Sequence, residues 1–105
     1  MTLDQKVTAR RNAHWWLTHG GTAWVRVNAV NTEWYGRDVS MLGATPGLRG
    51  FVIPKAEVPS ALKLLERRLR PGVKLIALIE TAVGLQRVAE LAAAEAVERL
   101  AFGSV

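Results

Sequence analysis

The stretch VKLIALIET, residues 73–81, joins an almost continuous apolar run to a polar end. A run of this kind is typical of a strand that is buried on both faces, as in a parallel sheet covered by helices. Pro71 and Gly72 interrupt the chain just before it, and Thr81 is a residue type that often caps the start of a helix. The stretch therefore predicts a buried strand that runs directly into a helix.

Three further strands are predicted on either side of this one. They cover residues 23–28, residues 50–53 (closed by Pro54) and residues 97–102. Four helices are expected to accompany the strands. The first passes through Lys6 and Trp15, has Thr2 and Gln5 as a capping box and ends at Gly20-Gly21. A short second helix begins at Asp38 after a polar loop over residues 31–36, and a third begins at Pro59-Ser60. The fourth follows Thr81, and its inner face carries Val83, Val88, Leu91 and Ala92.

Helices and strands that alternate in this way predict an α/β fold with a parallel sheet and right-handed crossovers. This order leaves two architectures open, a small doubly wound domain and part of a TIM (β/α) barrel. A complete barrel has eight strands and about 250 residues, so four strands in 105 residues are the size of half a barrel. We therefore expect one partial β/α-barrel domain over residues 1–105, with about four parallel strands and flanking helices.

The composition is that of an ordinary globular domain, with 50% hydrophobic and 22% charged residues. Cysteine is absent, which excludes disulfides and thiolate chemistry. No apolar run approaches the roughly 20 residues of a membrane span, and the first residues lack the apolar core of a signal peptide, so we expect a cytoplasmic protein without membrane contact. The net charge of +5 favours anionic partners. Because the basic residues are spread along the chain, a small nucleic-acid-binding domain is the weaker alternative.

Polar residues are predicted at the carboxyl ends of the strands, where both open parallel sheets and barrels bind ligands. They are Arg26, Asn28, Lys55, Glu80, Gly103 and Ser104. Arg26 interrupts an apolar strand, where an unpaired charge is costly. It serves either a structural ion pair or the binding of a carboxylate or an enolate by its planar guanidinium group. Glu80 serves either to cap the next helix or to bind magnesium through an oxygen atom.

Four short motifs in this chain resemble, in the same order and at compatible spacing, consecutive motifs of the HpcH/HpaI aldolase and citrate lyase superfamily. They are VRVN at residues 25–28, GFVIPK at 50–55, ALIETAVG at 77–84 and LAFGS at 100–104. The citrate lyase beta subunit is the branch that the chain resembles most.

The resemblance implies a magnesium-dependent TIM barrel and a carbon–carbon lyase similar to citrate lyase beta subunit or malyl-CoA lyase. Such an enzyme cleaves a 3-hydroxy-acyl thioester to a 2-oxo acid and an acyl-CoA, or carrier-bound acyl group, or forms it from them. By this analogy Arg26 is catalytic and binds the oxo acid, Gly103 contacts the substrate, and Glu80 is the first carboxylate ligand of Mg²⁺. The second ligand, an aspartate directly after Val105, is expected to be absent from this chain, which would correspond to strands three to six of the family barrel.

With one of two metal carboxylates missing, we expect the chain alone to be poorly active. The alternative is a non-catalytic interaction or assembly fragment. Two unpaired sheet edges, at Val25 and Leu100, predict self-association into a homo-oligomer.

Overall fold

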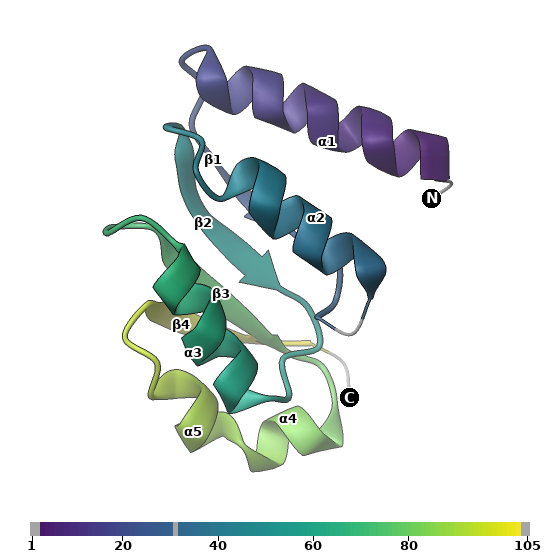
Figure 1. Cartoon of the computed structure of the whole chain (residues 1–105). Coiled ribbons are helices and arrows are strands. Elements are labelled where there is room, and N and C mark those ends of the chain that lie inside the picture. The colour runs from purple at the N-terminus through teal and green to yellow at the C-terminus, as the bar shows by residue number, and fades with distance from the viewer. Residues whose placement is uncertain (1–2, 31, 104–105) are drawn as a thin grey trace.

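A computed structural model describes residues 3–30 and 32–103 of the chain. Helices and strands alternate along it (Figure 1). In chain order they are α1 (Leu3–Thr18), β1 (Ala23–Arg26), α2 (Glu33–Leu42), β2 (Leu48–Ile53), α3 (Pro59–Arg68), β3 (Lys74–Ile79), α4 (Ala82–Gln86), α5 (Val88–Ala92) and β4 (Val97–Phe102).

The four strands form one sheet in the order β1-β2-β3-β4, and every neighbouring pair is parallel. Each strand therefore lies beside the next one along the chain, as in a β/α barrel, and no strand order reverses as it would in a doubly wound sheet. The predicted α/β fold with four parallel strands and flanking helices is confirmed.

The helices cover one face of the sheet, and the core lies between the two layers (Figure 1). Alternate strand residues point into this core because side chains along a strand alternate between the two faces. The strand residues that are fully buried are Phe51, Ile53, Leu75, Ala77 and Ile79. Leu17 of α1, Leu62 and Leu65 of α3 and Leu91 of α5 are buried from the helical side.

The other face of the sheet is not covered by any described element. Val52, Ile76 and Leu78 alternate with the buried core residues and remain partly exposed. Register pairs Arg26 with Val52, and Val52 with Ile76, so these three residues stand side by side on this face. We call it the open face. The apolar run of residues 73–79 was expected to be buried on both sides, and in this chain only one side is.

One expected loop is helical. Glu33 to Gly36 belong to α2, which begins at Glu33 and contains Asp38 in its middle. Asp38 was predicted to start a short helix, and that prediction is wrong because Asp38 is buried and paired. Its carboxylate accepts a hydrogen bond from Arg10 Nε at 2.9 Å. Both side chains are about nine-tenths buried, with 9% of Arg10 and 10% of Asp38 exposed. Arg10 Nη2 is buried without a hydrogen-bond partner among the described residues.

The segment after Thr81 forms two short helices, α4 and α5, which meet at Arg87. Thr81 caps α4 as predicted, because its side-chain oxygen accepts a hydrogen bond from the Gly84 N–H at 3.1 Å. The break at Arg87 changes which residues face inward. Leu91 is buried and Val88 packs against the core, whereas Val83 is 44% exposed and Ala92 is also exposed.

Several expectations concern residues outside the described part. Thr2 of the capping box, Asn31 of the expected loop and Ser104 at the end of the last strand belong to this group. No helix in residues 3–30 or 32–103 is both long enough and apolar enough to cross a membrane.

Candidate functional site at the carboxyl ends of the strands

Arg26 and Glu80 meet at one end of the sheet. They are far apart in sequence, and each stands at the carboxyl end of its strand, Arg26 closing β1 and Glu80 following β3. Arg26 Nη2 lies 3.8 Å from Glu80 Oε1. The parallel arrangement produces this meeting, because all four strands end on the same side of the sheet.

Glu80 lies between the residues that follow β2 and β4, the two strands that flank β3. On one side its Oε1 accepts a hydrogen bond from the Lys55 backbone N–H at 3.1 Å. On the other side the Gly103 N–H donates to the Ile79 carbonyl at 3.0 Å. A Cβ at Gly103 would lie 3.4 Å from Glu80 Cγ. Gly103 therefore leaves room for the glutamate side chain at the point where β4 ends.

Arg26 is more exposed than the sequence suggested. Its side chain is 63% exposed, compared with 26% for that of Glu80. Arg26 lies on the open face, where its guanidinium group remains in contact with water and needs no buried partner. A 3.8 Å ion pair with this exposure adds little stability, since exposed pairs contribute about 0–1 kcal/mol. The guanidinium group is therefore available to another anion.

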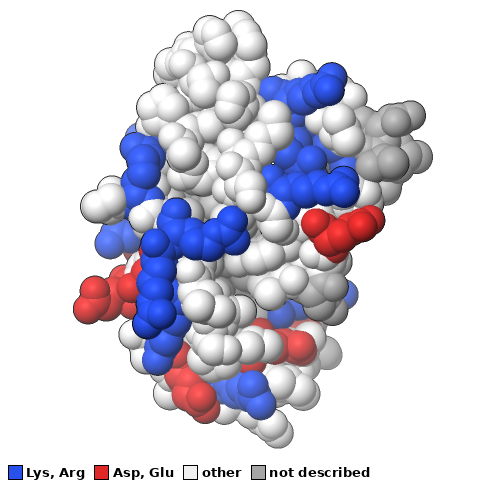
Figure 2. Space-filling model, viewed as in Figure 1, with Lys and Arg blue, Asp and Glu red and all other residues white. Residues whose placement is uncertain are grey.

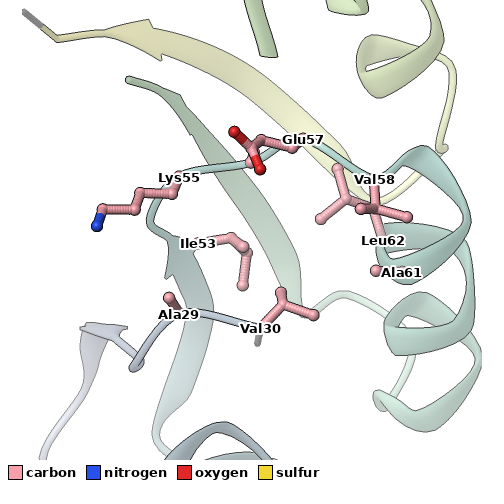
Figure 3. A pocket seen from close by; sticks show the side chains of 9 residues that line it. Ala29, Val30, Ile53, Lys55, Glu57, Val58, Ala61 and Leu62 are labelled. Carbon is pink, nitrogen blue, oxygen red and sulfur yellow. The ribbon is translucent and has the colours of Figure 1, made fainter. Parts of the chain in front are cut away.

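Lys55 follows β2 at the same end of the sheet. Its side chain points away from Val58 and Leu62, which line an apolar cavity of about 110 Å³ between the β1–α2 loop and α3 (Figure 3). The floor of that cavity includes Ile53 and Ala56. Lys55 and Glu57 also line this cavity, so it adjoins the charged end of the sheet.

Asn28, also expected at this site, has a different place. Its backbone N–H and its Nδ2 donate to Asp38 Oδ2, at 3.0 and 2.8 Å. Its Oδ1 accepts from Lys6 Nζ at 2.7 Å. Asn28 is therefore part of the hydrogen-bond network that joins α1, β1 and α2. Its side chain holds these elements together and makes no hydrogen bond to Arg26 or Glu80.

Charge at the site is mixed. Arg26 and Lys55 contribute positive charge and Glu80 negative charge, while the helical face shows Lys and Arg side chains in several separate groups with acidic side chains among them (Figure 2). Within the described ranges no cluster of three or more His, Asp or Glu side chains could hold a metal ion by itself. Glu80 can contribute one carboxylate, and its contacts with Lys55 and Arg26 both involve Oε1. Its other oxygen, Oε2, has no hydrogen bond or ion pair with residues 3–30 or 32–103 and could bind a cation.

The sequence profile of the HpcH/HpaI aldolase/citrate lyase family matches residues 1–105. The chain belongs to this family. A curated relative, the malyl-CoA/beta-methylmalyl-CoA/citramalyl-CoA lyase of Chloroflexus aurantiacus, is 39% identical over 87 residues, covering 71% of this chain and 25% of the relative.

Solved structures of HpcH/HpaI aldolase/citrate lyase relatives have the same fold. The citrate lyase beta subunit of Mycobacterium tuberculosis, complexed with oxaloacetate and magnesium, superposes with a TM-score of 0.74 at 29% identity, covering 98% of this chain and 44% of that chain. CitE from M. tuberculosis in complex with magnesium and pyruvate has a TM-score of 0.75 at 30% identity, with 98% and 41% covered. The chain thus spans less than half the length of these relatives.

Proposed function

We propose that this chain supplies part of the active site of a magnesium-dependent carbon–carbon lyase that acts on a 3-hydroxy-acyl thioester. The observation that carries the proposal is the meeting of Arg26 and Glu80 at the carboxyl end of a parallel sheet. The family membership and the oxo-acid and magnesium complexes of similar proteins support it.

Arg26 is proposed to bind the 2-oxo acid. A guanidinium group can donate two parallel hydrogen bonds to a carboxylate, and its permanent charge stabilises the oxygen on which negative charge develops as the carbon–carbon bond breaks or forms. Its 63% exposure leaves it accessible from the open face. Gly103 is proposed to contact the substrate through its backbone, because it has no side chain to fill the space beside Glu80.

Glu80 is proposed as a carboxylate ligand of Mg²⁺ through Oε2. Magnesium prefers oxygen ligands, keeps several waters and takes one or two protein carboxylates, so a single glutamate fits as one ligand of the set. When bound, the ion would polarise the oxo group of the substrate as a Lewis acid. We propose that a second carboxylate from outside the described residues completes the site, and that the chain alone turns over poorly.

The proposed partners are a 2-oxo acid and an acyl-CoA or carrier-bound acyl group. The Chloroflexus relative is named for malyl-CoA, beta-methylmalyl-CoA and citramalyl-CoA, and these three thioesters form the first substrate panel. The proposed domain assignment is a single partial β/α barrel over residues 1–105.

A chimaera tests the proposal. The residues of the Chloroflexus lyase that match this chain would be replaced by the residues of this chain, and cleavage of the three thioesters would be followed with and without Mg²⁺. We expect magnesium-dependent release of an oxo acid from at least one of them. A folded chimaera that cleaves none of them would contradict the proposed role of these residues.

We also propose that the 105-residue chain self-associates through its open face and its two sheet edges. Val52, Ile76 and Leu78 leave apolar surface on the open face, and Phe102 of the edge strand β4 is 63% exposed. Two copies that pair β1 with β4 in both directions would close an eight-strand barrel and cover this surface. This assembly also serves the alternative function, a non-catalytic interaction fragment.

Light scattering tests the self-association. The wild-type chain is expected to have the mass of a dimer, and Ile76→Asp, on the open face, is expected to shift the chain toward monomer. Val83→Asp is the matched control, because Val83 is 44% exposed on the helical side. A monomer at all concentrations, or equal effects of both variants, would refute this mode of association.

A further inference from the structure

The turn that follows β2 has an unusual backbone at Lys55. Its φ is 49°, which makes it the only non-glycine residue with positive φ in residues 3–30 and 32–103. The left-handed region is unfavourable for residues with a side chain, because Cβ approaches the carbonyl oxygen. Such a conformation persists only where the surrounding structure imposes it, and it often marks a functional position.

Hydrogen bonds on both sides of Lys55 fix this turn against the end of β3. The Lys55 N–H donates to Glu80 Oε1 at 3.1 Å, and the next N–H, that of Ala56, donates to the Leu78 carbonyl at 2.9 Å. Glu57, which follows Ala56, accepts a hydrogen bond at its Oε2 from Thr81 Oγ1 at 2.6 Å. The turn after β2 is thus joined to three nearby positions at the end of β3, and the glutamate is one of them.

These contacts give the two carboxylate oxygens of Glu80 different roles, because Oε1 is bonded to the protein and Oε2 is proposed to bind the metal. Oε1 accepts the hydrogen bond from the Lys55 N–H, and it also forms the ion pair with Arg26 Nη2 at 3.8 Å. Metal-binding carboxylates are commonly oriented by a hydrogen bond of this kind, and loss of such a partner costs roughly 10- to 100-fold in affinity or activity. With Oε1 held, the carboxylate presents Oε2 in a fixed direction.

We infer that Lys55 is a positioning residue for Glu80, and that it acts through its left-handed backbone N–H and not through its ammonium group. The inference rests on the proposed metal role of Glu80 for its functional consequence. The Lys55 side chain points away from the turn (Figure 3), and its ammonium group makes no hydrogen bond or ion pair within the described part of the chain. A residue that tolerates positive φ can therefore replace lysine, whereas a β-branched residue cannot.

Three variants of the full chain separate backbone from side chain. Lys55→Gly and Lys55→Asn remove the ammonium group but tolerate the left-handed conformation. Lys55→Val also removes the charge and disfavours that conformation. The probe is Mn²⁺, whose paramagnetism broadens the amide NMR signals close to it. We expect broadening around Glu80 at similar Mn²⁺ concentrations in wild type, Lys55→Gly and Lys55→Asn, and a requirement for roughly 10- to 100-fold more Mn²⁺ in Lys55→Val.

Hydrogen exchange of the Lys55 amide provides a readout that needs neither metal nor a folded valine variant. The Lys55 N–H is expected to exchange slowly in wild type and much faster in Glu80→Ala, whereas the Ala56 N–H, which bonds to a backbone carbonyl, stays protected in both. Equal Lys55 exchange in wild type and Glu80→Ala would overturn the inference, and so would a loss of Mn²⁺ binding in Lys55→Gly as large as in Lys55→Val. Absence of broadening at Glu80 in wild type would instead count against the metal site of the proposed function, and exchange alone would then decide whether Lys55 holds Glu80.

Discussion

Glu80→Gln in the chimaera is expected to remove magnesium-dependent cleavage almost completely. The amide keeps the shape of the side chain and can still accept a hydrogen bond from the Lys55 N–H, but it loses the negative charge that a hard divalent cation needs. A residue that only orients a metal ligand contributes roughly 10- to 100-fold, so we expect the loss of the ligand itself to lower kcat/KM by more than that. Steady-state kinetics over a range of Mg²⁺ concentrations measure the effect.

Glu98→Gln is the control for this experiment. Glu98 is exposed near the opposite end of the sheet, at the start of β4, so its substitution removes the same charge without touching the site. Its kcat/KM should match that of the parent chimaera. Full activity of Glu80→Gln, with the Mg²⁺ dependence unchanged, would refute the metal role of Glu80.

Asp38→Ala is expected to have the largest effect on stability. Asp38 accepts hydrogen bonds from Arg10 and from two nitrogens of Asn28, and both charged side chains are about nine-tenths buried. Removing one partner of a buried ion pair leaves the other charge uncompensated, which typically costs about 3–5 kcal/mol. Small domains have total stabilities of about 5–15 kcal/mol, so this variant should be close to unfolding. Urea denaturation followed by circular dichroism measures the change.

Glu33→Ala is the matched control for Asp38→Ala. Glu33 lies on the same helix, α2, but is exposed in its first turn. Surface substitutions of this kind usually change stability by less than about 0.5 kcal/mol. If the two variants unfold at the same urea concentration, the buried network does not stabilise the fold in the way described.

The four strands and the residues at their carboxyl ends could be predicted from local patterns, whereas these patterns leave the order of the strands in the sheet open between a doubly wound domain and a barrel. Apolar runs and helical spacing alternate clearly around Pro59 and Thr81, and parallel strands must bring their carboxyl ends to one edge. This was enough to place Arg26, Glu80 and Gly103 together. The ion-pair distance and the exposure of Arg26 could not be predicted, because they depend on how strands distant in sequence are spaced and covered.

The start of α2 was missed for a physical reason. Gly36 and the polar residues around it favour a loop, and Asp38 has a low helix propensity. The helix is stabilised by tertiary contacts, which include the burial of Val39 and Leu42 and the pairing of Asp38 with Arg10, 28 residues away. The left-handed conformation of Lys55 was also invisible in the sequence, because no glycine or asparagine occupies that position to signal it. Its role became apparent only from its hydrogen bond to Glu80.

In the proposed function, Arg26 and Glu80 together bind an oxo acid and magnesium. Titration of the isotope-labelled chimaera with pyruvate, in the presence and absence of Mg²⁺, tests it most directly by NMR. We predict that pyruvate shifts the Arg26 guanidinium signals and the amides at residues 80 and 103 much more strongly when Mg²⁺ is present, and that Glu80→Gln removes this difference. Pyruvate-induced shifts that are the same with and without Mg²⁺, or that lie elsewhere in the chain, would contradict the claim.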